Sequence, residues 1–132
     1  MRIIRKNLGH IKMDDFSKTL KGLSALAQET RLCVFRYLMK SGATGVQAGK
    51  IATDLDIAPN KLSAHLSILV AADLLDVRKD GRRMIYSANI NATADLIKSL
   101  IETCCDNNPT LCKALNDVAA PVAEQKEPAV CG

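Results

Sequence analysis

Three cysteines near the C-terminal end of the chain could bind a thiophilic ion. Cys104, Cys105 and Cys112 lie in the segment CCDNNPTLC. Adjacent residues of a helix point about 100° apart, so the first two thiols alone cannot enclose an ion. A bend at residues 107–109 would bring the third thiol beside them. Three thiolates on one side match the pyramidal bonding of As(III) or Sb(III), and soft ligands favour such centres.

Other uses of these thiols stay open at this point. The same cluster could take Cd(II), Pb(II) or an organoarsenical, or could form a disulfide as an oxidation switch. Cys33 stands among Leu32 and Phe35 and is predicted as a core residue, whereas Cys131 is predicted as an uninvolved thiol, with an accessory ligand as the alternative. A thiol enzyme would need an activating base beside the cysteine, and no histidine accompanies the cluster. We therefore expect no enzymatic activity.

A second group of side chains has the pattern of a DNA-reading helix. Pro59 suits the first position of a helix that runs to about Asp73, because its missing N–H costs nothing there. Leu62, Leu66 and Leu69 fall on its inward face. Short polar side chains and amides read base edges, and cations bind phosphates. The predicted DNA-contacting residues of this helix are Asn60, Lys61, Ser63, Ala64, His65 and Ser67.

Cations gather in the segment that follows this helix. Asp80-Gly81 between two short β-prone runs predicts a hairpin in which both of these residues take positive φ. Four cations surround the pair, and we expect them at the hairpin tip, where they would contact phosphates or the minor groove. They are Arg78, Lys79, Arg82 and Arg83.

The remaining elements follow from the apolar spacing. Three- and four-residue steps predict helix over residues 15–40, a glycine-containing break at 41–45, and a short helix at about 47–55. A last helix is predicted at about 91–106, and a short helical segment at 110–118. The predicted fold is mostly α with a small β-hairpin (α+β), in the order α-α-α-α-β-β-α, which is a dimeric winged helix-turn-helix.

Length and charge set the limits of this interpretation. The 132 residues predict one domain, and the net charge of +4 is carried by the first 12 residues, which hold four cations and no acid. We expect a disordered basic segment at 1–14, the DNA-binding and dimerisation domain at 15–106, a cysteine-containing extension at 107–118 and a disordered tail at 119–132. No leader or membrane span is evident, so a cytoplasmic protein is expected.

The order of these motifs resembles a known family. The segments LSALAQETRLCVFRYL and KIATDLDIAPNKLSAHLSILVAADLLDVRKDGRRMIYS are similar to the ArsR/SmtB metalloregulatory repressors over about residues 16–105. Ala58 departs from the serine usual at that helix N-cap. The resemblance implies a homodimer that binds operator double-stranded DNA and releases it on ligand binding. A cysteine-only site beside the last helix is similar to the arsenic-sensing branch, which implies control of an arsenic-resistance operon.

Overall fold

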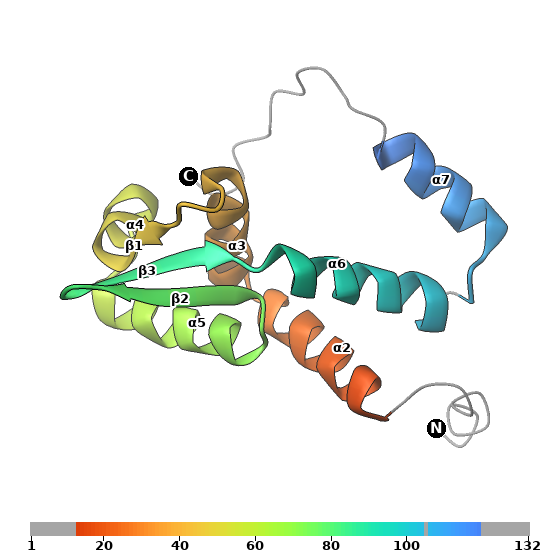
Figure 1. Cartoon of the computed structure of the whole chain (residues 1–132), viewed down its shortest axis with the longest axis horizontal. Coiled ribbons are helices and arrows are strands. Elements are labelled where there is room, and N and C mark those ends of the chain that lie inside the picture. The colour runs from red at the N-terminus through yellow and green to blue at the C-terminus, as the bar shows by residue number, and fades with distance from the viewer. Residues whose placement is uncertain (1–12, 105, 120–132) are drawn as a thin grey trace.

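The computed structural model describes residues 13–104 and 106–119. Helices and a three-stranded sheet follow one another in the predicted α-α-α-α-β-β-α order, with a short extra strand and a further C-terminal helix (Figure 1). The elements are α2 (Met13–Leu26), α3 (Glu29–Ser41), β1 (Val46–Gln47), α4 (Ala48–Leu55), α5 (Pro59–Ala71), β2 (Leu75–Asp80), β3 (Arg83–Ala88), α6 (Ile90–Ser99), the π-helical turn η2 (Leu100–Cys104) and α7 (Pro109–Ala119).

The helical region predicted at 15–40 is two helices, the first of which begins at Met13. The chain becomes extended at Gln28, with φ −149° and ψ 133°. The Gln28 side-chain oxygen accepts a hydrogen bond from the backbone N–H of Arg31 at 2.9 Å and so caps α3. The break therefore has a local cause that apolar spacing does not reveal.

An aliphatic core joins α3, α4, α5 and the start of β2. Its largest fully buried side chains are Leu38, Ile51, Leu62, Leu66, Leu69, Leu74 and Val34. The three leucines of α5 are those placed inward by the sequence, and each is 2% exposed or less. Their burial fixes which face of α5 remains available to a partner.

The sheet has the strand order β1-β3-β2 and is antiparallel throughout. Strand β1 was not expected, because two residues are too few to show a strand pattern. Gly45 precedes it at φ +77°, where an added Cβ would stand 2.8 Å from the carbonyl oxygen of Tyr86. Only glycine tolerates both this conformation and this close approach.

The hairpin turn differs from the prediction by one residue. Asp80 pairs with Arg83 as part of the strands, so the two loop residues are Gly81 and Arg82. Only the first takes a positive φ, at 63°, and Asp80 is extended. Glycine at the first loop position is the pattern of a type II′ turn, which suits the twist of the strands as well as the expected type I′ turn does.

The helix predicted to reach about residue 106 changes character earlier. Regular α-helix ends at Ser99, and the π-helical turn η2 carries the chain on to Cys104. Two residues in the left-handed conformation, Asp106 (φ 50°) and Asn107 (φ 49°), then reverse the chain. The predicted bend is present at this reversal.

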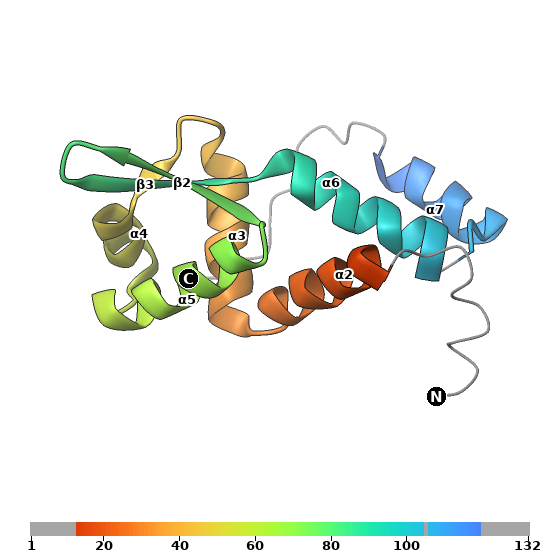
Figure 2. The ribbon, with the colours of Figure 1, turned by 60° about the horizontal axis from the view of Figure 1, so that its bottom comes forward.

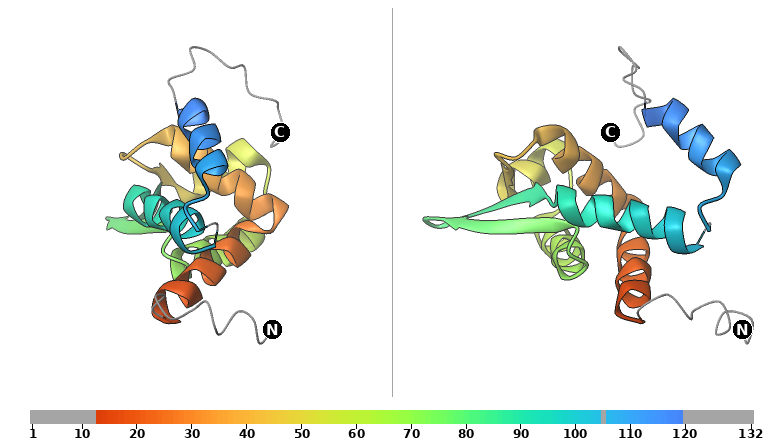
Figure 3. Two further views of the ribbon diagram at one scale, coloured as in Figure 1. Left: turned by 90° about the vertical axis from the view of Figure 1, so that its right-hand side faces the viewer. Right: turned by 45° about the vertical axis from the view of Figure 1, so that its right-hand side comes forward.

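Helix α7 begins directly after the reversal and matches the expected helical segment at 110–118. The Asn108 side chain accepts hydrogen bonds from the backbone N–H groups of Thr110 and Leu111 at 3.0 and 3.2 Å, and Pro109 takes the first helical position. Figures 2 and 3 show α6 and α7 at the end of the molecule opposite the hairpin. Every helix in the described ranges is too short or too polar to cross a lipid bilayer.

Candidate nucleic-acid interface and cysteine segment

The outer face of α5 carries the predicted reading residues. Asn60, Lys61, Ser63, Ala64 and Ser67 are exposed, and His65 is half-buried. The face is therefore polar and uncovered, with the buried leucine stripe behind it. Short polar groups on a rigid helix meet the requirement for reading base edges in a major groove.

Two of these side chains already hold local hydrogen bonds. Ala58, the N-cap of α5, offers no side-chain acceptor. The Asn60 side-chain oxygen instead accepts from the backbone N–H of Lys61 at 3.0 Å. The Ser67 hydroxyl donates to the carbonyl oxygen of Ser63 at 3.0 Å. Base contact by Asn60 would exchange an existing bond for a new one, whereas the exposed Lys61 ammonium needs no such exchange.

The position of α4 relative to α3 depends on a network that the sequence analysis missed. The Tyr37 hydroxyl donates to a carboxylate oxygen of Asp54 at 2.6 Å, and Lys50 pairs with the same oxygen at 3.0 Å. Burial, followed by the hydrogen bond and charge of Asp54, raises the pKa of Tyr37 to about 12. The hydrogen bonds from Tyr37 and Lys50 lower the pKa of Asp54. Because Tyr37 and Asp54 are 17 positions apart, no local pattern could have indicated this network.

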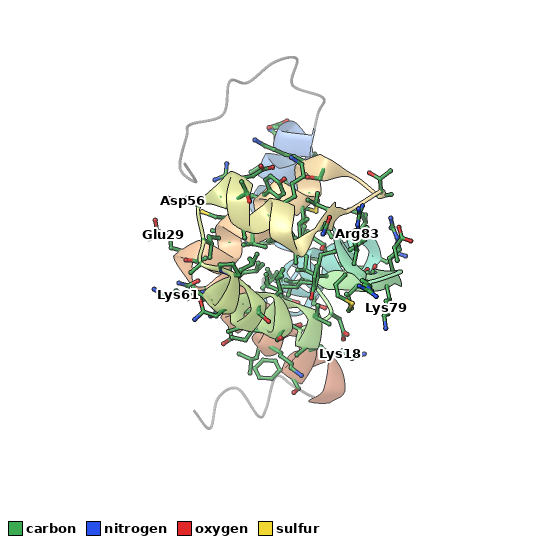
Figure 4. All side chains as sticks on the ribbon, turned by 90° about the vertical axis from the view of Figure 1, so that its left-hand side faces the viewer. Lys18, Glu29, Asp56, Lys61, Lys79 and Arg83 are labelled. Atoms are coloured by element: carbon green, nitrogen blue, oxygen red, sulfur yellow. The ribbon has the colours of Figure 1, made fainter. Side chains whose placement is uncertain are left out.

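The hairpin presents three exposed cations near its turn, and Arg78 is used differently. The guanidinium of Arg78 donates to the carbonyl oxygen of Thr44, in the loop before β1, at 2.6 Å. Lys79, Arg82 and Arg83 are exposed. Figure 4 shows Lys61 extending from α5 and Lys79 and Arg83 extending from the hairpin, on one face of the molecule. This face, formed by the exposed side of α5 and the hairpin, is the candidate nucleic-acid interface.

His65 contacts a residue that the sequence did not single out as functional. Nη1 of Arg31, on α3, lies 3.5 Å from Nδ1 of the His65 ring. Burial, and secondly the charge of Arg31, lower the pKa of His65 below its ordinary value of 6.5. The ring is consequently neutral near pH 7.

Only some of the cysteines fall within the described residues. Cys112 is a half-buried free thiol in the first turn of α7. Cys105, Cys131 and the side chain of Cys104 lie outside the described residues. Cys33, expected as a plain core residue, is half-buried and disulfide-bonded. Its partial exposure leaves room for the second sulfur of that bond. Within the part of the chain that is described, three or more His, Cys, Asp or Glu side chains nowhere gather to hold a metal ion.

Known proteins share this arrangement. A helix-turn-helix domain family matches residues 26–78, from the end of α2 into β2. A "probable mercury resistance operon repressor" of Streptomyces lividans is 30% identical over 79 residues, which are 60% of this chain and 61% of the relative. The chain thus spans less than two thirds of that protein's length.

Solved structures extend the likeness to the whole fold. An ArsR-like transcriptional regulator from Rhodococcus sp. RHA1 superposes with a TM-score of 0.63 at 23% identity, over 81% of this chain and 97% of that one. A "possible transcriptional regulator for arsenical resistance" superposes with a TM-score of 0.54 at 25% identity, over 79% of this chain and 98% of that one. Fold and surface together define a winged helix-turn-helix protein. Within that class its fold is that of the ArsR-type regulators.

Proposed function

We propose that the protein is a transcriptional repressor, without enzymatic activity, that binds operator DNA as a homodimer and is released by As(III) or Sb(III). The observation that carries the DNA-binding part is the exposed polar face of α5 beside the cationic hairpin. A recognition helix of this kind enters the major groove, and the hairpin cations neutralise phosphates. The proposed target is an arsenic-resistance operon, in keeping with the name of one structural neighbour.

The homodimer is supported by apolar side chains on α2 and α6. Leu20, Leu23, Ile90 and Ile97 are between 39% and 58% exposed on these two helices, which pack together away from the hairpin. Exposed apolar residues gathered on adjoining elements are typical of an interface between copies of a chain. A second copy on this face would place two α5 helices on one DNA duplex, about one turn apart.

The proposed sensor consists of Cys104, Cys105 and Cys112. The reversal at Asp106 and Asn107 turns the chain back between Cys104 and the first turn of α7, which carries Cys112. Three thiolates would bind As(III) from one side, and each ligand must lose its proton first. The names of a mercury resistance repressor and an arsenical resistance regulator among the similar proteins support a thiophilic inducer.

A physical path joins this segment to the dimer face. The π-helical turn η2 ends at Cys104 and continues α6 without a break. Helix α6 packs closely on α2, since an added Cβ at Gly22 would stand 3.2 Å from the Leu96 side chain. Ion capture that reshapes η2 would therefore be felt between α6 and α2. The ion releases DNA only by binding more tightly to the low-affinity form of the dimer.

The test is operator release measured by fluorescence anisotropy under titration with As(III), Sb(III), Cd(II), Hg(II) and Zn(II). Serine variants of Cys104, Cys105 and Cys112 should bind the operator as the wild type does and should fail to release it with As(III). If Cys112→Ser still releases the operator at the wild-type As(III) concentration, the three-thiolate site is wrong. Cys131→Ser is the next variant, because Cys131 is the alternative third ligand.

A second candidate signal is oxidation, favoured by the disulfide at Cys33. Two thiols would lose two electrons and two protons to an oxidant, and a reductant would restore them. Diamide should then release the operator from the wild type but not from Cys33→Ser, and dithiothreitol should restore binding. Release by As(III) under full reduction, together with indifference to diamide, would exclude this alternative.

A further inference from the structure

Arg31 connects three helices through its side chain. It stands in the first turn of α3 and is half-buried. Its Nε donates to the carbonyl oxygen of Ala25 at 2.6 Å, and its Nη2 donates to that of Ser24 at 3.5 Å. Both carbonyls belong to the last turn of α2, where carbonyl groups lack helical partners and a cation is favoured. The third direction of the guanidinium points to α5.

That third contact determines the state of the His65 ring. A guanidinium offers only donors, so the ring nitrogen 3.5 Å from Nη1, which is Nδ1, must act as an acceptor. A neutral ring with an acceptor at Nδ1 carries its proton on Nε2. The two nitrogens occupy opposite edges of the ring, so the Nε2–H group points away from Arg31. His65 itself lies between the buried leucine stripe and the exposed face of α5.

We propose that Arg31 is a positioning residue for DNA recognition: by its contact with Nδ1 it holds His65 as the Nε2–H tautomer, so that the ring offers one oriented donor to an acceptor on the operator. Phosphate oxygens and the N7 and O6 atoms of guanine are such acceptors. The same guanidinium holds the end of α2, so a shift of α2 against α3 would also disturb the donor on α5. This inference rests on the proposed function, in which α5 faces DNA.

The first measurement needs no DNA. Long-range ¹H–¹⁵N correlation spectra of the full chain report the tautomer and the pKa of each histidine, and the His65→Gln variant identifies the His65 signal. The wild type should show the proton on Nε2 and a pKa below 6.5. Arg31→Met keeps an unbranched side chain without donors, and it should raise the pKa of His65 and relax the tautomer preference. Lys21→Met, on exposed α2, removes the same charge and should change neither.

A wild-type proton on Nδ1, or a ring that does not respond to Arg31→Met, overturns the proposal. If Arg31→Met does not fold, as judged by circular dichroism, Arg31→Lys takes its place. A single ammonium cannot serve the α2 carbonyls and the ring together, so the same direction of change is expected.

The second measurement is a double-mutant cycle on DNA affinity. The probe is a duplex that the wild-type protein selects from a random-sequence library. Arg31→Met should weaken binding about tenfold, the effect of removing one hydrogen bond to a charged group. In the His65→Gln background the same change should cost little more, because the ring is gone. Fully additive effects would mean that Arg31 acts only by holding α2, and the proposal would then be wrong. If the wild type selects no duplex, the proposed function fails, while the spectra still decide the Arg31–His65 contact.

Discussion

Replacing Arg82 and Arg83 by alanine removes two exposed cations from each hairpin, and therefore four from a homodimer. Removing one phosphate contact lowers the slope of log K against log salt by about 0.9, so removing four should lower it by about 3.6. Between 50 and 200 mM salt, the wild-type affinity should therefore fall about 150-fold more than the affinity of the variant. The weakening should be similar for all DNA sequences, because phosphates carry no sequence information.

The assay is fluorescence anisotropy with the selected duplex and with a scrambled duplex, each at four salt concentrations. Arg78→Ala serves as the matched control, since its guanidinium already donates to the Thr44 carbonyl oxygen and should change the slope less. A variant slope equal to that of the wild type would refute phosphate contact by the hairpin. Weakening confined to the selected duplex would assign these arginines to base reading instead.

Three further predictions concern other parts of the molecule. Lys61→Ala should cost about 1–3 kcal/mol at particular base positions of the operator, and uniform weakening over all sequences would assign this lysine to the backbone. Gly45→Ala should lower the free energy of unfolding by more than about 2 kcal/mol, because an added Cβ meets a carbonyl oxygen at 2.8 Å, whereas Gly42→Ala, at the same φ in open space, should cost about 1 kcal/mol in urea denaturation. The raised pKa of Tyr37, about 12 against 10, means that its stabilising bond to Asp54 is intact below pH 10 and is lost as the pH rises through 12. The difference in urea midpoint between wild type and Tyr37→Phe should therefore shrink over that range, and a constant difference would argue against the bond.

Local patterns in the sequence were enough to find the helices and the reading face. The leucine steps of α5 identify its buried side because an α-helix repeats every 3.6 residues whatever surrounds it. Pro59, Gln28 and Asn108 act on backbone groups within three positions of themselves, so their effects are in principle readable from the chain alone. The cysteine segment was noticed for the same reason, through the closeness of its members in the sequence.

Contacts between distant positions were decided by the tertiary structure. The pairing of Asp80 with Arg83 moved the hairpin turn by one residue, since the register of the whole sheet, including β1, outweighs a dipeptide preference. Arg31 and His65 are 34 positions apart and meet only because α3 packs against α5. A sequence states which side chains can donate and accept, but the partner of each donor is chosen when helices pack, because packing brings together groups that no local period relates.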